Sequence, residues 1–308
     1  MTDNSKSIWG EDKLDRHLSA HYLTDYLNAM FVDEDTGDDL YKSTFVLNIN
    51  AGWGFGKTFF IIKWVEELKL NNQPVVYFDA WSNDFAEDPL LAFIAELEDG
   101  LKPYTKDLPK GSRALKDVMK AAKNVLLPVL TIVANASIST LSSGLITELT
   151  AGEQENLVDN SINAYRDKKE AISTFKDKLI NLVAELKIKN SSKLPIYIFI
   201  DELDRCRPTY AVSLLEAIKH IFGVNGFYFI VATNKTELSH SIKAIYGSEF
   251  DALTYLRRFF DQEYILPKPD NDKFASYLMK RFRLESDDRL FTPIDASMFP
   301  IDPIACWR

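Results

Sequence analysis

A glycine-rich segment near residue 50 constrains this chain more than any other feature. Its sequence is Ala51-Gly52-Trp53-Gly54-Phe55-Gly56-Lys57-Thr58. An apolar, strand-like stretch at 43–49 precedes it, and a helix-like stretch at 59–68 follows it. A strand, a glycine-rich loop, a Lys-Thr pair and a helix form the setting that a phosphate-binding loop requires. The sequence therefore predicts such a loop, and a glycine-rich turn that only caps a helix is the alternative.

The residue types in this loop suit the phosphates of a nucleotide. Glycines let backbone N–H groups turn toward phosphate oxygens without a Cβ in the way, and the N-terminus of the next helix favours negative charge. We expect Lys57 to reach the β- and γ-phosphates and the Thr58 hydroxyl to bind magnesium. The predicted nucleotide-binding residues are Gly52, Trp53, Gly54, Phe55, Gly56, Lys57, Thr58 and Phe59. Ala51 departs from the pattern GxxxxGK(S/T), and alanine does not tolerate a strongly positive φ.

A second apolar segment, 195–200, ends in two acids, Asp201 and Glu202. Beside a phosphate-binding loop, the first acid of such a strand supports magnesium and the second can take a proton from the attacking water. We therefore predict Asp201 as a magnesium ligand and Glu202 as a catalytic base. A strand with a solvated acidic end is the alternative. Glu202 and the extra strand-like segment 75–79 favour the ASCE-type branch of P-loop proteins. In that branch another strand lies in the sheet between the strand that precedes the glycine-rich loop and the strand that ends in the two acids.

Three further residues are candidates for catalysis. The apolar segment 226–233 ends in Thr233-Asn234, and Asn234, with Thr233 as second choice, could contact the γ-phosphate or the attacking water. A helix N-cap explains Asn234 equally well. Arg257 and Arg258 could stabilise transition-state charge, in cis or from a neighbouring copy, whereas a surface pair bonded to nearby acids is the alternative and is slightly favoured.

Composition narrows the class of protein. The chain has 308 residues with 46% hydrophobic, enough for a substantial core, and its net charge of −9 argues against a broad surface for nucleic acid. Its two cysteines, Cys206 and Cys306, show no spacing of a disulfide framework or zinc site. The polar N-terminus lacks the apolar core of a signal peptide, so we expect a cytoplasmic protein. Trp53 and Trp81 are interpreted as packing residues rather than base-stacking platforms.

Periodicity and breaks predict the order of the elements. Helices are expected at 13–31, 89–101, 168–189, 210–222, 235–246, 250–260 and 273–283, and strands at 43–49, 75–79, 195–200, 226–233 and 263–266. The uncharged run 124–147 is long enough to cross a bilayer once. One crossing would place Lys57 and Asp201 on opposite sides, although both must reach one nucleotide. We therefore predict a buried helical hairpin or surface-dipping insertion there and do not favour membrane contact.

Several stretches resemble the KAP family of P-loop NTPases. They are the leading helix 13–30, the loop containing Trp53-Gly54, the segment 77–81 followed by Asp88-Pro89-Leu90, the acidic motif 200–208, and 255–260 followed by Leu266-Pro267. The resemblance covers about residues 10–270, and the acidic motif is its most specific part. Glu202 and Asn234 stand where an aspartate is frequent in the family, and Ala51 replaces the family glycine.

The resemblance implies an α/β fold: a P-loop NTPase (ASCE-type) parallel sheet flanked by helices, with a helical insertion between the two nucleotide motifs. We expect this domain at 1–270 with the insertion at about 100–192, and a C-terminal helical extension at 271–308 that is either naturally short or truncated. The resemblance also implies ATP and Mg²⁺ as cofactors. Hydrolysis would then drive a conformational or assembly switch through self-association or a protein partner. Members include plasmid- and phage-exclusion proteins of bacteria. A slowly hydrolysing nucleotide-gated module and a membrane-associated scaffold are the alternatives.

Overall fold

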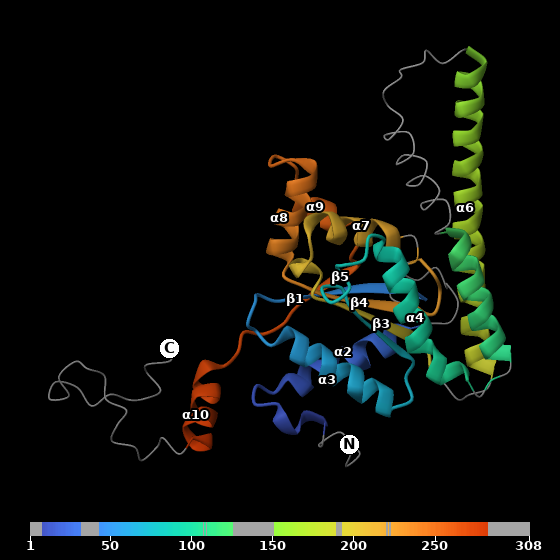
Figure 1. Ribbon diagram of the computed structural model, residues 1–308. Helices are drawn as coiled ribbons and strands as arrows, with labels where there is room; N and C mark the ends of the chain where they lie inside the picture. The colour runs from blue at the N-terminus through green and yellow to red at the C-terminus, as the bar shows by residue number, and fades with distance from the viewer. Residues whose placement is uncertain are drawn as a thin grey trace.

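The computed structural model shows a single parallel sheet with helices on both faces (Figure 1). It describes residues 8–31, 43–106, 108, 110–125, 151–188, 193–219, 221 and 223–282. The strands are β1 (Phe45–Asn50), β2 (Val75–Asp79), β3 (Ile196–Asp201), β4 (Phe227–Thr233) and β5 (Gln262–Ile265). Their order in the sheet is β2-β3-β4-β1-β5, and every neighbouring pair is parallel.

The strand order confirms the predicted fold class. β4 lies between β1, which leads into the glycine-rich loop, and β3, which carries the two acids. β3 and β4 are buried along their whole length, as expected for central parallel strands covered on both faces. The edge strand β5 has no fully buried residue. Because all five strands are parallel, their carboxyl ends meet at one edge of the sheet, and the predicted site residues follow those ends.

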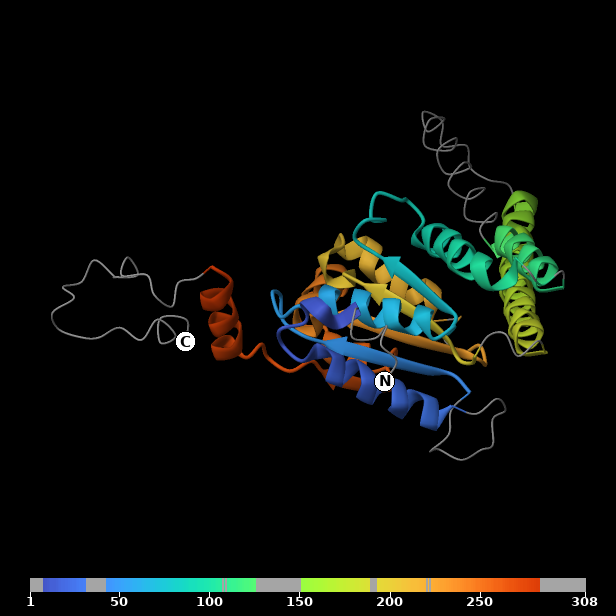
Figure 2. The same cartoon turned by 90° about the horizontal axis from the view of Figure 1, so that it is seen from below.

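The helices cover the sheet in two layers. They are α2 (Arg16–Met30), α3 (Lys57–Leu70), α4 (Pro89–Thr105), α6 (Ala151–Ile188), α7 (Pro208–Ile218), α8 (Lys235–Tyr246), α9 (Ala252–Leu256) and α10 (Asn271–Arg281), with short 3-10 turns η1 (Trp9–Glu11) and η2 (Leu203–Arg205). Residues 110–125 are also helical. α2 and α3 lie on one face, and α4, α7 and α8 lie on the other (Figures 1 and 2).

One predicted helix is too long. The segment 250–260 forms α9 over only five residues. The N–H groups of Arg258 and Phe259 bond to carbonyls three residues back instead of four, so the helix tightens into a turn. This turn redirects the chain into β5. The other predicted helices agree with the observed ones apart from their ends, although α6 begins well before the predicted residue 168.

The core has one cluster on each face of the sheet. Alternate side chains of β3 show the division: Tyr197 and Phe199 pack with Trp64 of α3, whereas Ile198 packs on the other face with Phe93 of α4. Alternation of this kind follows from the pleat of a strand. Since both faces are apolar, the polar groups of the chain gather at the strand ends.

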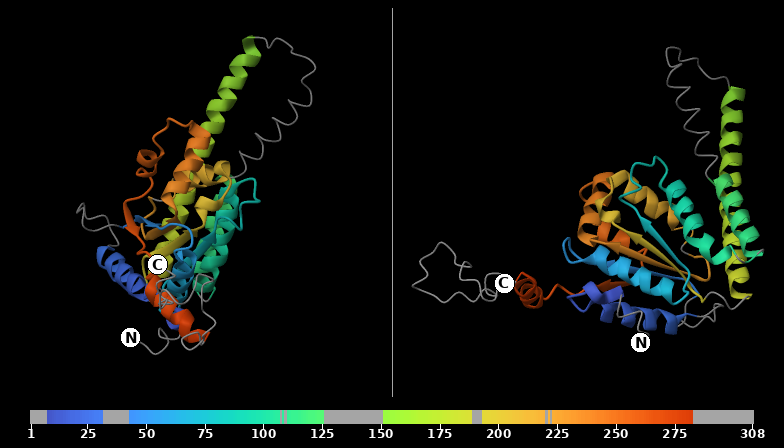
Figure 3. Two further views of the ribbon diagram at one scale, coloured as in Figure 1. Left: turned by 90° about the vertical axis from the view of Figure 1, so that its left-hand side faces the viewer. Right: turned by 60° about the horizontal axis from the view of Figure 1, so that its bottom comes forward.

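α6 is a helix of 38 residues whose C-terminal part packs against the sheet layer while its N-terminal part extends beyond it (Figures 1 and 3). Its packed side chains include Phe175, Leu179 and Leu182, all buried. Val183 lies against Gly226, just before β4, where a Cβ would be 2.6 Å from Val183 Cγ1. Glycine with its φ of +88° is therefore required at that position.

Two predicted segments lie partly outside the described residues. They are the uncharged run 124–147 beyond residue 125, and the C-terminal extension 271–308 from residue 283. Over the part of the chain that is described, no helix combines the length and apolarity needed to cross a membrane.

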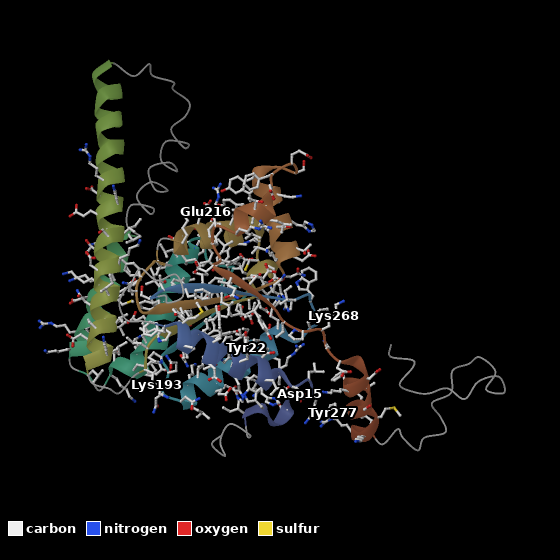
Figure 4. The ribbon with its side chains drawn as sticks, turned by 180° about the vertical axis from the view of Figure 1, so that it is seen from behind. Asp15, Tyr22, Lys193, Glu216, Lys268 and Tyr277 are labelled. Atoms are coloured by element: carbon white, nitrogen blue, oxygen red, sulfur yellow. The ribbon has the colours of Figure 1, made fainter. Side chains whose placement is uncertain are left out.

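α10 follows β5 and stands apart from the sheet in the right-hand view of Figure 3. It contacts the segment that leads into α2. Lys273 donates to Asp15 over 2.6 Å, and the Lys13 ammonium lies 5.2 Å from the centre of the Tyr277 ring. Asp15 and Tyr277 lie close together where these two segments meet (Figure 4). Exposed ion pairs of this kind contribute little stability, whereas Ala275 and Met279 of α10 are buried.

Candidate functional site

The glycine-rich loop joins β1 to α3 with two glycines in the left-handed region. Gly54 has φ +78° and Gly56 has φ +77°, angles that other residues adopt at a cost. Gly56 is also the residue before the first turn of α3. Ala51 lies outside the left-handed region and is buried, and its N–H donates to the Thr233 carbonyl over 3.1 Å. The alanine therefore fits the loop without strain.

Lys57 occupies the first turn of α3 and turns back over the loop. Its ammonium donates to the Ala51 carbonyl over 3.2 Å and lies 3.7 Å from Asp204 Oδ1. Burial lowers the pKa of Lys57, and the negative charges of Asp204 and Asp201 partly offset that effect. The amine thus sits between the loop and the end of β3, with a charged partner already in place.

Asp201 ends β3 in a fully buried position. Its Oδ1 accepts the Glu202 N–H over 2.8 Å, and the Thr58 and Tyr77 hydroxyls lie near the carboxyl group without a well-formed hydrogen bond to its buried Oδ2. Burial raises the pKa of Asp201 to about 6, with a smaller contribution from the Glu202 charge. A buried carboxylate oxygen without a donor costs free energy, and a cation beside it would remove that cost.

Glu202 has an unusual backbone conformation. Its φ of 59° and ψ of 24° are left-handed, although it carries a full side chain. Its Oε1 accepts the Thr58 hydroxyl over 2.9 Å and lies 3.0 Å from an Arg205 guanidinium nitrogen. Strained residues persist where the surrounding structure holds them, and they cluster at functional sites. The strain aims the Glu202 carboxylate at the start of α3.

Four predicted residues, Lys57, Thr58, Asp201 and Glu202, are thus gathered at the carboxyl edge of the sheet. A family model described as the KAP family P-loop domain matches residues 19–290. The chain belongs to the KAP family. Among curated proteins, none matches the chain. The matched region runs past residue 270 and includes α10, and membership of this P-loop NTPase family supports nucleotide binding and hydrolysis as the class of function.

The acidic motif of this KAP domain contributes two residues that were not among the predicted site residues. Asp204 accepts the indole N–H of Trp53 over 2.8 Å besides lying near Lys57. Arg205 pairs with Glu202, and its guanidinium lies 5.7 Å from the centre of the Trp81 ring. An Asp-Arg pair directly after a strand that ends in two acids was the available sequence signal.

The two tryptophans are not core residues, so their interpretation as packing residues was wrong. Trp53 is 56% exposed and Trp81 is 53% exposed. Each is held instead by one charged residue of η2, through a hydrogen bond for Trp53 and a cation–π contact for Trp81. In this KAP domain they form the outer rim of the site.

The end of β4 supplies polar groups beside the loop. Thr233 is fully buried, and its hydroxyl accepts the side-chain N–H of Asn48 over 2.8 Å. Asn234 caps α8, since its side-chain oxygen accepts the N–H groups of Thr236 and Glu237. The cap interpretation therefore describes the structure, and a contact from the Asn234 amide nitrogen to phosphate stays a prediction. Asn48 was missed, although a lone polar residue within an apolar strand was its signal.

Arg257 and Arg258 follow α9 and are exposed. The charge of Arg257 contributes to lowering the pKa of Glu263, after the hydrogen bonds from Lys235 and Asn50. Among the described residues, no hydrogen bond or ion pair joins either arginine to the gathered site residues. Their proposed action from a neighbouring copy stays a prediction.

Arg16, at the start of α2, is a further residue that sequence reasoning missed. It is buried and donates to the Phe55 carbonyl in the loop and to the Pro267 carbonyl after β5, both over 2.7 Å. The loop is thereby fastened to two distant segments. Phe59, predicted to contact nucleotide, lies in α3 with its ring 6.5 Å from that of Trp9.

Proposed function

We propose that this KAP domain binds ATP with magnesium and hydrolyses it. The observation that carries the proposal is the meeting of Lys57, Thr58, Asp201 and Glu202 at one edge of the sheet, with a buried Asp201 oxygen that lacks a donor. The left-handed conformations of Gly54 and Gly56 also give the loop the kind of backbone turn that a phosphate cradle needs. The preference for ATP over other nucleoside triphosphates follows from the family resemblance.

Each residue has a role that its chemistry supports. Lys57 and the loop amides would bind the phosphates, and Thr58 and Asp201 would hold magnesium, a hard cation that prefers oxygen ligands. When bound, magnesium supplies positive charge that offsets the charge developing on the phosphate oxygens. Glu202 would take a proton from the water that attacks the γ-phosphorus, as the bond to the bridging oxygen breaks and ADP leaves.

Two substitutions test these roles. Lys57→Ala should abolish nucleotide binding, and Glu202→Gln should retain binding while turnover falls by about 10²-fold or more. Lys63→Ala in the same helix and Glu98→Gln on α4 are matched controls, because both residues lie away from the gathered site residues. Normal affinity in Lys57→Ala would contradict the loop assignment, and unchanged turnover in Glu202→Gln would contradict the base assignment.

The proposal extends to a conformational or assembly switch driven by hydrolysis, with self-association or a protein partner as its output. Particle size measured with and without a non-hydrolysable ATP analogue tests it. Nucleotide-dependent assembly would support Arg257 or Arg258 acting in trans, and loss of turnover on Arg257→Ala only in the assembled state would identify that residue. The family resemblance alone extends the proposal to bacterial anti-phage or plasmid-exclusion defence, which phage plating on expressing cells tests.

A second candidate is a nucleotide-gated module that hydrolyses slowly or not at all. It is favoured by one observation: Lys57 and Glu202 both have oppositely charged partners within the chain. Single-turnover hydrolysis with magnesium separates the two candidates. Rapid conversion of bound ATP would exclude the module, and stable retention of ATP over many minutes would exclude the fast ATPase.

A further inference from the structure

The short turn η2 places an oppositely charged residue beside Lys57 and another beside Glu202. Asp204 Oδ1 lies 3.7 Å from the Lys57 ammonium, and the Arg205 guanidinium lies 3.0 Å from Glu202 Oε1. Both partners come from consecutive positions of the acidic motif. Lys57 and Glu202 thus each have an oppositely charged partner within the chain.

The Lys57–Asp204 pair is shielded from water. The Asp204 side chain is 1% exposed and that of Lys57 is 9% exposed, so solvent and salt screen their attraction weakly. Trp53 fixes the carboxylate through its bond to Asp204 Oδ2, whereas buried Oδ1 has no hydrogen-bond donor. Charge attraction to Lys57 is thus the main favourable interaction available to that oxygen.

This arrangement conflicts with nucleotide binding. Phosphate oxygens would need the same ammonium group, and a carboxylate beside them would repel them. We propose that Asp204 is a positioning residue, a counter-ion that competes with nucleotide phosphates for Lys57 and so sets a lower affinity than the loop alone would give. This inference rests on the proposed function, because it concerns occupancy of the same loop.

Asp204→Asn tests the competition. Asparagine keeps an acceptor for the Trp53 N–H and removes only the charge. We expect the Kd for a non-hydrolysable ATP analogue with magnesium to fall by about tenfold, a change within the range measured for close charge pairs. The nucleotide-free variant should melt at a lower temperature, because Lys57 loses its partner, and the analogue should raise its Tm by more than it raises that of the unmodified protein.

Two controls isolate the charge. Asp99→Asn on α4 makes the same change in net charge at a side chain that is 70% exposed, and it should leave the Kd unchanged. Trp53→Phe removes the hydrogen bond to Asp204 but keeps the carboxylate, so it should give no gain in affinity. If Asp204→Asn does not fold, Asp204→Ser removes the same charge, and the same gain is expected.

The outcomes separate the inference from the proposed function. If the unmodified protein binds the analogue and the folded, neutral Asp204 variant binds it equally or more weakly, the competition is overturned. An equal gain from Trp53→Phe would overturn it too, because loosening of the loop would then explain the effect. If neither the unmodified protein nor Asp204→Asn binds any nucleotide, the proposed function fails and the competition falls with it. Binding by Asp204→Asn alone would support the inference in its strongest form.

Discussion

The hydroxyl of Thr58 donates a hydrogen bond to Oε1 of Glu202 over 2.9 Å. This bond joins the first turn of α3 to the end of β3, although β4 separates β1 from β3 in the sheet. The Glu202 carboxylate accepts the hydrogen of this hydroxyl, and a magnesium ion would bind the oxygen of the same group. Binding of magnesium and nucleotide would therefore change the surroundings of the proposed base, Glu202, as well as those of the phosphates.

Thr58→Val and Thr58→Ser separate the hydroxyl from the shape of the side chain. Valine keeps the shape, whereas serine keeps the oxygen. We expect the valine variant to lose most of the affinity that magnesium adds, about tenfold or more, and the serine variant to stay within about threefold of the unmodified protein. Nucleotide titrations with and without magnesium measure the difference. Equal magnesium stimulation in all three proteins would refute Thr58 as a ligand.

Glu202→Gly and Glu202→Ala measure the backbone strain at φ 59°. Both variants lose the side-chain contacts equally, so their difference reports the conformation alone. We expect glycine to give a free energy of unfolding about 1 kcal/mol higher than alanine. At Glu98, inside α4, the opposite order is expected by about the same amount. Urea denaturation of the four variants measures both pairs, and the same order at both positions would show that Glu202 is unstrained.

Asp201→Asn should change how stability depends on pH. The pKa of Asp201 is about 6 against an ordinary value of 3.8, so the folded state holds this proton more tightly than the unfolded state. The contribution of this group to stability is therefore greatest below pH 3.8 and is lost as the pH rises through about 6.

At one pKa unit per 1.4 kcal/mol, the ionised group costs the ligand-free fold up to about 3 kcal/mol above pH 7. Asparagine removes that cost. We expect Asp201→Asn to be more stable than the unmodified protein at pH 7.5 and to lose this advantage near pH 4. Denaturant titrations over that range measure it, and a variant that is less stable at every pH would contradict the raised pKa.

Arg205→Gln and Arg205→Lys test how the proposed base, Glu202, is held. The guanidinium fixes the Glu202 carboxylate while resting on the Trp81 ring. We expect glutamine to lower kcat about tenfold with little change in KM, because the positioning of a catalytic group matters more in the transition state than in binding. Lysine keeps the charge and should recover part of the rate. Steady-state kinetics measure the changes in kcat and KM separately, and a change confined to KM would assign Arg205 to substrate binding.

Much of the fold could be predicted from the sequence because buried parallel strands are apolar runs with polar ends. All five strands were placed within two residues, and the expected separation of the motif strands is met by β4. The central site residues, Lys57, Thr58, Asp201 and Glu202, follow directly from two such strand ends.

The contacts that tune the site could not be predicted, because they join segments distant in sequence. Arg16 reaches Pro267 across 251 positions, and Trp53 reaches Asp204 across 151. A hydropathy pattern also favours burial for any tryptophan, and it could not show that Trp53 and Trp81 would be held at the surface by neighbouring charges. The position of Asn234 fitted both a contact to phosphate and a helix N-cap, and only the structure showed that its side chain caps α8.

α6 has a mechanical consequence. A helix of 38 residues measures about 57 Å from end to end, and its C-terminal part packs against the domain through buried side chains such as Phe175 and Leu182. Val183, within that packed part, touches Gly226 at the start of β4, the strand whose other end bonds to the loop. A rotation of about 10° at Val183 would move the N-terminal end of α6, which begins at Ala151 about 48 Å away, through about 8 Å. A small rotation at the packed end of α6 would thus become a several-fold larger displacement at its far end.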